Sequence, residues 1–167
     1  MIFDFSRIKN SKNLLAFSGG VDSSALFFLL LNHKIDFDIA IVNYNTREQS
    51  KDEIAYALNL AKEYKKEIFI KDVKLENSSN FEKNARDIRY GFFEQIIKEN
   101  SYETLITAHQ LNDRLEWFLM QLSKGAGLVE LFGIREFEEK KDYKIFRPLL
   151  NVSKDELENY LKENKIK

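Results

Sequence analysis

The residues best suited to hold a phosphate form a glycine turn between an apolar strand and an apolar helix. In order they are Ser18, Gly19, Gly20, Val21, Asp22, Ser23 and Ser24. Glycines let the backbone turn sharply and approach an anion without an intervening Cβ. The serines after the turn would present hydroxyls and free amides at the positive end of the helix. The turn therefore predicts a loop that holds a phosphate by dipoles.

Asp22 sets this turn apart from common nucleotide-binding loops. No Gly-Lys-Ser/Thr follows, as a Walker A loop requires, and no G-x-G-x-x-G dinucleotide signature is present. A carboxylate repels a neighbouring phosphate unless Mg²⁺ or a cationic side chain lies between them. We therefore expect Asp22 to be a Mg²⁺ ligand or a catalytic residue. The alternative is an ordinary strand-to-helix turn in which Asp22 caps the helix.

A second polar cluster follows an apolar run at 105–108. On a helix these side chains fall within about 100° of one another: His109, Asn112, Asp113 and Glu116. We expect the apolar arc on the other side to pack against the protein: Leu111, Leu115, Phe118, Leu119 and Leu122. On its own, such a polar face is more typical of a solvated helix. If the helix begins beside the glycine turn, however, Asp113 and Glu116 face a nucleotide and attract an ammonium group or a metal.

Short apolar runs alternate along the chain with segments of helical spacing, at 54–61 and 81–96 among others. We predict strands at 14–17, 38–42, 68–73 and 105–108. The alternation indicates an α/β fold with an open, mostly parallel sheet and helices on both faces. A charged stretch at 136–144 predicts an exposed turn between two short strands, and Ser153 with Glu156 predicts a capping box that opens a final helix. In such sheets ligands bind at the carboxyl ends of the strands, where both polar clusters lie.

The string Ser-Gly-Gly-x-Asp-Ser at 18–23, placed after a first strand, resembles the PP-loop of the ATP pyrophosphatases. Members of this superfamily share a Rossmann-like fold, cleave ATP between its α and β phosphates, and adenylylate a carbonyl oxygen. They include synthetases of GMP, NAD and argininosuccinate, tRNA thiolases and tRNA(Ile)-lysidine synthetases. The turn alone does not distinguish among them.

The segment His109–Glu116 resembles the His-x-x-Asp-Asp-x-x-Glu segment of the tRNA(Ile)-lysidine synthetases. The similarity continues through Asn-Ala-Arg-Asp-Ile-Arg-Tyr at 84–90, Phe-Leu-Met at 118–120, Lys-Gly-Ala-Gly-Leu at 124–128 and Arg-Pro-Leu-Leu at 147–150. These motifs stand in the family's order over nearly the whole chain. The chain therefore resembles the catalytic N-terminal domain of that family.

The resemblance implies a ligase that joins free L-lysine to the wobble cytidine of the CAU anticodon of tRNA(Ile). ATP and Mg²⁺ would serve the reaction, which passes through an adenylylated cytidine and releases AMP and pyrophosphate. The implied catalytic residues are Asp22, Arg89, His109 and Asp113. ATP would lie on the glycine turn and lysine on Asp113 and Glu116, while Arg89 would hold a phosphate or order the carboxylates. The residues alone leave open a salt bridge or stem packing for Arg89, and they do not say which group accepts the proton of lysine.

The chain departs from the family pattern at four positions. It has Asn43 and Tyr44 where the family usually has Asp-His, and it keeps Arg47 a little later. Asn112 replaces an aspartate, and Trp117 stands where threonine is common. We expect no metal or adenine contact at Asn43 or Asn112, and we assign Trp117, like the phenylalanines, to the core.

Composition excludes several function classes. A chain without cysteine cannot hold disulfides, thiolate zinc sites or iron–sulfur clusters, and it lacks the thiol that sulfur-inserting tRNA thiolases need. With 26 basic and 27 acidic residues it carries a net charge of −1, so we expect it to bind tRNA weakly by itself. No apolar run is long enough to span a bilayer, which favours a cytoplasmic protein without a membrane partner.

The length of 167 residues suits one domain. We expect a single ATP-binding catalytic domain over 1–167, without the helical C-terminal domains that grip tRNA in the family. The sequence is silent on oligomeric state, and a homodimer is compatible with it. The rival hypotheses are another PP-loop enzyme and a non-catalytic module that only binds adenine nucleotides.

Overall fold

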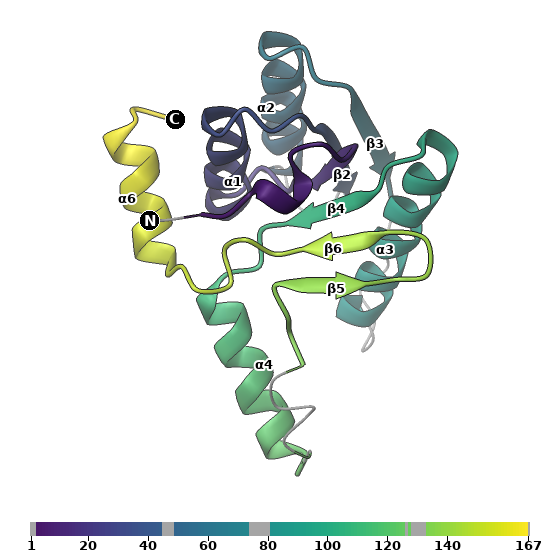
Figure 1. Ribbon diagram of the computed structural model, residues 1–167, viewed down its shortest axis with the longest axis vertical. Helices are drawn as coiled ribbons and strands as arrows, with labels where there is room; N and C mark the ends of the chain where they lie inside the picture. The colour runs from purple at the N-terminus through teal and green to yellow at the C-terminus, as the bar shows by residue number, and fades with distance from the viewer. Residues whose placement is uncertain (1–2, 45–48, 74–80, 126, 128–132, 167) are drawn as a thin grey trace.

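The computed structural model describes residues 3–44, 49–73, 81–125, 127 and 133–166. One six-stranded sheet lies at its centre, with the order β3-β2-β1-β4-β6-β5 (Figure 1). Its strands are β1 (Asn13–Ala16), β2 (Asp38–Asn43), β3 (Ile68–Asp72), β4 (Thr104–Thr107), β5 (Phe137–Glu139) and β6 (Lys144–Phe146). The helices are α1 (Val21–Asn32), α2 (Gln49–Glu63), α3 (Phe81–Asn100), α4 (Leu111–Ser123) and α6 (Lys154–Glu163), with a 3₁₀ turn η1 (Ser6–Ile8) before β1.

The sheet is parallel except at its β5 edge, where β5 runs antiparallel to β6. The first four strands match the predicted ones to within one residue at each end, so the predicted open, mostly parallel sheet is confirmed. β1 lies between β2 and β4, with Ala16 in register with Ala40 on one side and Thr107 on the other. The strand order reverses between β1 and β4, and ligands of such sheets bind at this switch point.

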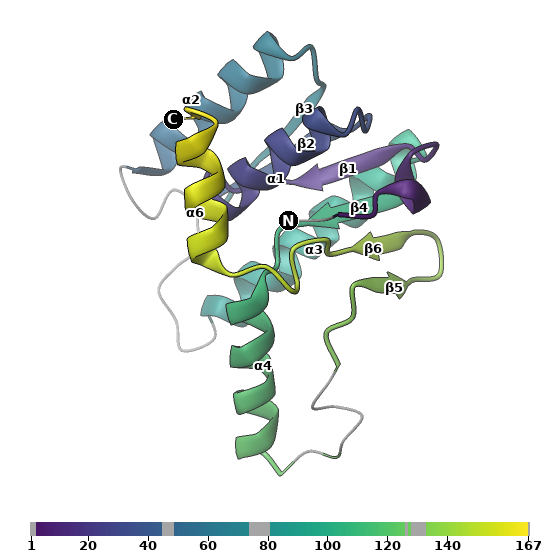
Figure 2. The ribbon, with the colours of Figure 1, turned by 60° about the vertical axis from the view of Figure 1, so that its left-hand side comes forward.

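Helices cover both faces of the sheet, as predicted, and each face has its own core (Figure 2). α1, α2 and α6 pack on one face, where Leu15, Ile39 and Ile106 point. α3 packs on the other through Phe93 and Ile97. Successive strand residues point to opposite faces, so strands buried on both sides are apolar throughout.

The predicted capping box of the last helix is confirmed. The Ser153 amide donates to Glu156 Oε2 at 2.9 Å, and the Glu156 amide donates to Ser153 Oγ at 3.3 Å. A turn between two short strands lies within the predicted stretch 136–144, but it is shorter than that stretch. β5 occupies its first half, and the chain reverses over 140–143, where the Lys140 amide donates to the Tyr143 carbonyl at 2.9 Å.

α4 contradicts the expectation that its apolar arc packs against the protein. It projects away from the sheet in both views (Figures 1 and 2), and none of its described residues is buried. Leu115 and Leu119 are 55% and 54% exposed. Hydrogen bonds hold the first turn of α4: the Leu111 amide donates to the Val152 carbonyl, and Arg114 donates to Asn151 Oδ1. An amphipathic pattern predicts an apolar face, but it does not say which layer lies against that face.

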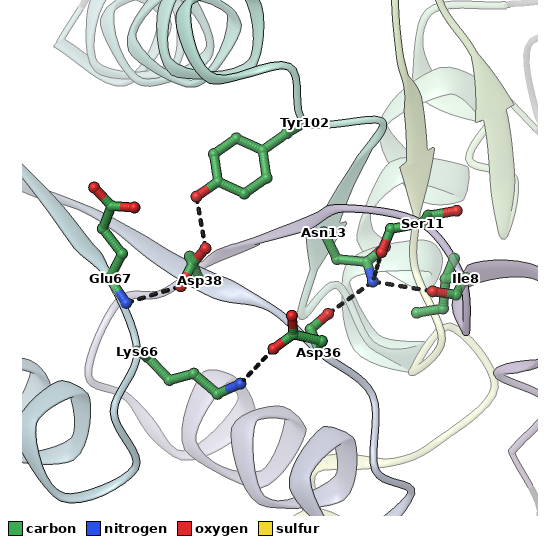
Figure 3. Close-up of polar contacts among 8 residues, drawn as sticks. All are labelled: Ile8, Ser11, Asn13, Asp36, Asp38, Lys66, Glu67 and Tyr102. Atoms are coloured by element: carbon green, nitrogen blue, oxygen red, sulfur yellow. Dashed lines mark hydrogen bonds and ion pairs between the residues drawn. The ribbon is translucent and has the colours of Figure 1, made fainter.

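Polar side chains fasten the edge of the sheet at the amino ends of β1 and β2 (Figure 3). Buried Asn13 donates from Nδ2 to the carbonyls of Ile8, Ser11 and Asp36 at 2.8–3.0 Å. The Tyr102 hydroxyl donates to Asp38 Oδ2 at 2.7 Å, and burial together with this bond raises the pKa of Tyr102. These contacts hold η1 and the strand starts in place, and they lie at the edge opposite the glycine turn.

Candidate active site at the switch point

The glycine turn contains one position that only glycine occupies without strain. Gly19 has φ +78°, and a Cβ built on it would lie 2.8 Å from Glu53 Cβ. Gly20 is the N-cap of α1, and no side chain among the described residues caps that helix. The first amides of α1 are therefore open to an anion, as the sequence predicts for a phosphate loop. The alternative role of Asp22 as helix cap is wrong.

Ser18 and Ser23 form hydrogen bonds within the glycine turn. Ser23 Oγ donates to the Gly20 carbonyl at 3.1 Å, accepts from the Ser18 amide at 3.3 Å and lies 3.1 Å from Ser18 Oγ. Ser24 differs from the prediction, because its amide donates to the Gly20 carbonyl at 2.9 Å and its side chain is buried. Its amide makes the first intrahelical bond of α1 and is not free for a ligand.

Six of the predicted site residues line one pocket of about 240 Å³ between the carboxyl ends of β1 and β4. They are Ser18, Asp22, Ser23, Arg89, His109 and Asp113. We call this cavity the switch-point pocket. Gly19 and Gly20 shape its turn without lining it, and Glu116 lies exposed one helical turn beyond Asp113. The structure therefore brings the phosphate loop and the second polar cluster together, which makes a solvated face the poorer interpretation of His109 and Asp113.

Asp22 has a buried oxygen without a partner. Its Oδ1 forms no hydrogen bond among the described residues. Burial raises the pKa of Asp22, and the neighbouring Asp113 carboxylate raises it further. Two carboxylates that repel each other beside a phosphate loop attract a cation to the space between them.

The residues fit Mg²⁺ as an ion shared with a bound phosphate. The described residues contain no group of three His, Asp or Glu side chains that could hold a metal by themselves. Mg²⁺ keeps several waters and commonly binds through one or two carboxylates plus substrate phosphates. The unpartnered oxygen of Asp22, at the N-terminus of α1, fits the role of such a carboxylate ligand.

His109 is neutral at physiological pH. Burial lowers its pKa to about 4, and the guanidiniums of Arg147, Arg89 and Arg86 lower it as well, whereas Asp113 opposes them. Its Nδ1 lies 2.8 Å from Thr107 Oγ1, which orients the ring. In this state His109 is a weak base, so it is a poor acceptor for the proton of an ammonium ion until an anion binds nearby.

Asp113 has two tasks. Its Oδ2 accepts from the Gln110 amide at 2.7 Å, and Gln110 Oε1 accepts from the Asn112 amide at 2.9 Å. This capping box starts α4 and aims the Asp113 carboxylate into the switch-point pocket. Sequence reasoning missed it, because Gln110 is an uncommon N-cap.

Sequence reasoning also missed two polar residues of the pocket wall, Thr107 and Tyr90. Thr107 precedes His109 by two positions, and Tyr90 follows Arg89, whose guanidinium carbon lies 5.9 Å from the tyrosine ring centre. A hydroxyl at the last position of β4 was the available signal for Thr107. Trp117, predicted to be in the core, lines a second pocket instead.

The departures from the family pattern lie outside the switch-point pocket. Asn43 donates to Asp72 Oδ1 at 2.7 Å at the ends of β2 and β3, and Asn112 is exposed on α4. Lys124 is the C-cap of α4 and Gly125 follows it with φ +67°, so this run acts as a helix stop. Arg47, Ala126 and Leu128 lie outside the described residues.

A family model described as a PP-loop domain matches residues 3–167. The chain belongs to the PP-loop family. A PP-loop domain accounts for the glycine turn, its place after β1 and the strand reversal beside it. No helix among the described residues has both the length and the apolar content to cross a bilayer.

Relatives of this PP-loop domain carry a more specific name. The tRNA(Ile)-lysidine synthase of Campylobacter jejuni strain RM1221 is 55% identical over 159 residues, which are 95% of this chain and 49% of the relative. That of Helicobacter pylori strain 26695 is 53% identical over 158 residues, 95% of this chain and 47% of the relative. The chain thus spans about half the length of these relatives.

Solved structures share the fold at lower identity. The tRNA thiolase NcsA of Methanococcus maripaludis superposes with a TM-score of 0.82 at 22% identity over 99% of this chain and 60% of its own. The NH₃-dependent NAD synthetase of Campylobacter jejuni superposes with a TM-score of 0.61 at 18% identity, over 96% of this chain and 68% of its own. These similarities concern the fold alone. The thiolase structure holds a [4Fe-4S] cluster, which a chain without cysteine cannot ligate.

Proposed function

We propose that this chain is the catalytic PP-loop domain of a tRNA(Ile)-lysidine synthetase, a ligase that joins L-lysine to the wobble cytidine of a CAU anticodon. The observation that carries the proposal is the meeting of His109 and Asp113 with the glycine turn in one pocket. Relatives named tRNA(Ile)-lysidine synthase, with 55% and 53% identity over 95% of the chain, support the choice among PP-loop enzymes.

The first half-reaction transfers adenylate. The carbonyl oxygen of cytosine attacks the α-phosphorus of ATP, the bond from that phosphorus to the β-phosphate oxygen breaks, and pyrophosphate leaves. The open amides at the start of α1 and the Ser18 and Ser23 side chains hold the phosphates. Asp22 would hold Mg²⁺, which supplies charge neutralisation on the pyrophosphate when bound. Arg89, in the same pocket, stabilises charge on the α-phosphate.

The second half-reaction joins lysine to the adenylylated base. The ε-amine forms a bond to the activated carbon, the bond from this carbon to the adenylate oxygen breaks, and AMP leaves. Asp113 holds an ammonium group of lysine, and Glu116 on the next turn of α4 holds the other. Bound phosphates offset the three guanidiniums around His109, which raises its pKa and makes it a better proton acceptor.

Release of both products tests this function. We expect full-length protein with ATP and tRNA(Ile) carrying a CAU anticodon to release pyrophosphate, and AMP to follow when lysine is added. A tRNA with uridine at the wobble position should release neither product. Nucleotide binding without turnover would indicate a binding module, and turnover without RNA would indicate another PP-loop enzyme; either result contradicts the proposal.

Two further parts of the proposal concern the whole protein. A protein that uses ATP, lysine and tRNA belongs in the cytoplasm, where these substrates meet. The exposed apolar side chains of α4, such as Leu115 and Leu119, are compatible with a homodimer. Sedimentation equilibrium of the full-length protein tests the latter, and a monomer throughout the micromolar range would contradict it.

A further inference from the structure

A second pocket shares a wall with the switch-point pocket. It has a volume of about 220 Å³, and Arg89, Tyr90 and His109 line both cavities. Its remaining wall contains Arg86, Trp117, Ile134, Glu138 and Arg147. We call it the arginine pocket. Because the same three side chains border both cavities, a group bound in one lies next to a group bound in the other.

The arginine pocket carries an excess of positive charge. Of its three guanidiniums, that of Arg147 is neutralised by Glu138 at 2.8 Å and also donates to the Arg135 carbonyl. Arg86 and Arg89 form no ion pair with a carboxylate among the described residues, although both approach the Tyr90 ring. All three lower the pKa of the His109 imidazole between the pockets. An anionic ligand relieves this repulsion.

Aromatic rings complete the pocket. Tyr90 comes from α3 and Trp117 from α4. Aromatic rings beside arginines are how proteins hold unstacked bases of single-stranded RNA, because rings stack on the base and guanidiniums bind the phosphate. Trp117 is also a position at which the chain departs from the family pattern.

We propose that the arginine pocket binds the acceptor nucleotide of the RNA, with the base against Trp117 and the adjoining phosphate on Arg86. The inference rests on the proposed function, because adenylylation must bring the acceptor oxygen to within about 3–3.5 Å of the α-phosphorus. ATP in the switch-point pocket and a nucleotide in the arginine pocket meet at Arg89 and His109. Arg147, through its bonds to Glu138 and Arg135, is a positioning residue that keeps this wall in place.

Trp117 is the only tryptophan among these 167 residues, so the part of the emission change that a Trp117→Phe variant loses reports on the arginine pocket. The probe is an RNA stem-loop with a CAU anticodon, titrated into the full-length protein. We expect the RNA to quench Trp117 emission and ATP alone to leave it unchanged. A Trp117→Phe variant, which keeps an aromatic ring, should bind labelled stem-loop with affinity within about threefold of the parent, whereas Trp117→Ala should bind about tenfold more weakly.

Arg86→Ala tests the phosphate contact. Its affinity for the labelled stem-loop should fall about tenfold, and the slope of log affinity against log salt should decrease by about 1. Lys98→Ala is the matched control, because Lys98 is an exposed cation on the same helix about 18 Å further along its axis. It should leave affinity and slope unchanged.

The inference would be overturned if Trp117 emission did not change on saturation with the stem-loop. It would also be overturned if the Arg86→Ala variant bound the stem-loop with the same affinity as Lys98→Ala. Quenching by ATP alone would overturn it too. The proposed function is tested separately. Release of pyrophosphate with tRNA, without a change in Trp117 emission, contradicts only the proposal for the arginine pocket. Quenching by the stem-loop in a protein that never releases pyrophosphate contradicts only the enzyme.

Discussion

At the scale of residues, the site depends on groups whose conformation or charge is set by one or two neighbours. Gly19 takes a left-handed backbone conformation against Glu53, Asp22 keeps a buried oxygen without a partner, and His109 is held neutral by burial and by arginines. In the proposed function each property serves the binding of a phosphate, and each gives a measurable response when it is changed.

We predict that Gly19→Ala lowers the free energy of unfolding by about 1–3 kcal/mol, because φ is +78° and the new Cβ meets Glu53. The affinity for ATP should fall with it. Gly91→Ala is the control: it lies within α3 and nothing stands within 4 Å of its built Cβ, so stability should rise by about 0.5–1 kcal/mol. Urea denaturation measures both. Equal stability of the two variants would contradict the tight turn.

The lowered pKa of His109 predicts a dependence of stability on pH. Its pKa is about 4 in the folded protein, below the ordinary 6.5, so between these values the unfolded chain binds more protons. Above pH 6.5 the imidazole is neutral in both states and does not lower the free energy of unfolding. As the pH falls from 6.5 toward 4, the free energy of unfolding decreases by up to about 1.4 kcal/mol per pH unit. Between pH 7 and pH 5, chemical denaturation should show that the His109→Asn variant loses less free energy of unfolding than the parent. Parallel curves for parent and variant would contradict the assignment.

At the scale of elements, α4 connects the fold to the chemistry. Hydrogen bonds of the Leu111 amide and of Arg114 attach its first turn to the domain, and its capping box involves Asp113 directly. The same carboxylate therefore starts a helix and faces the switch-point pocket. Capping and the proposed lysine binding can be separated, because capping needs an acceptor oxygen and lysine binding needs a negative charge.

We predict that Asp113→Asn keeps the cap and removes the charge. Its free energy of unfolding should stay within about 0.5 kcal/mol of the parent, whereas Asp113→Ala should lose about 1 kcal/mol. The KM for lysine should rise about tenfold or more in both variants, because both lack the carboxylate. Chemical denaturation and steady-state kinetics measure the two effects. An unchanged KM in Asp113→Asn would exclude the carboxylate from lysine binding.

The sequence predicts most of these elements, and the exceptions have physical reasons. Strand positions follow from runs that must be apolar on both faces, and the capping box at Ser153 follows from local hydrogen bonding. The meeting of His109 with the glycine turn could be expected because both follow strands of one parallel sheet. The exposure of Leu115 and Leu119, the place of Trp117 and the arginine pocket depend on tertiary contacts that no local pattern encodes.

At the scale of the whole molecule, the residues that stabilise the fold and those of the proposed ligand site lie in different places. Two cores hold the helices against the sheet, and the amino-end network of Asn13, Asp38 and Tyr102 secures the edge away from the ligand. The switch-point pocket and the exposed face of α4 lie outside these cores. The carboxyl edge is therefore free to carry charged and unpartnered groups.

We predict a sharp contrast between two leucine substitutions. Leu119→Glu on α4 should change the free energy of unfolding by no more than about 0.5 kcal/mol, because this side chain is 54% exposed. Leu157→Ala on α6 should cost about 2–5 kcal/mol, because Leu157 is fully buried against α1. Urea denaturation of the purified domain measures both. Comparable losses would mean that α4 packs against the domain.

The central claim is that phosphates bind in the turn after β1, opposite Asp113 and His109. A crystal structure with the α,β-methylene analogue of ATP, which cannot release pyrophosphate, tests it most directly. We expect phosphate oxygens within about 2.7–3.2 Å of the backbone amides of 20–23, and the α-phosphorus facing His109 and Asp113 across the switch-point pocket. A nucleotide bound elsewhere, or one whose α-phosphate points away from these side chains, would contradict the account.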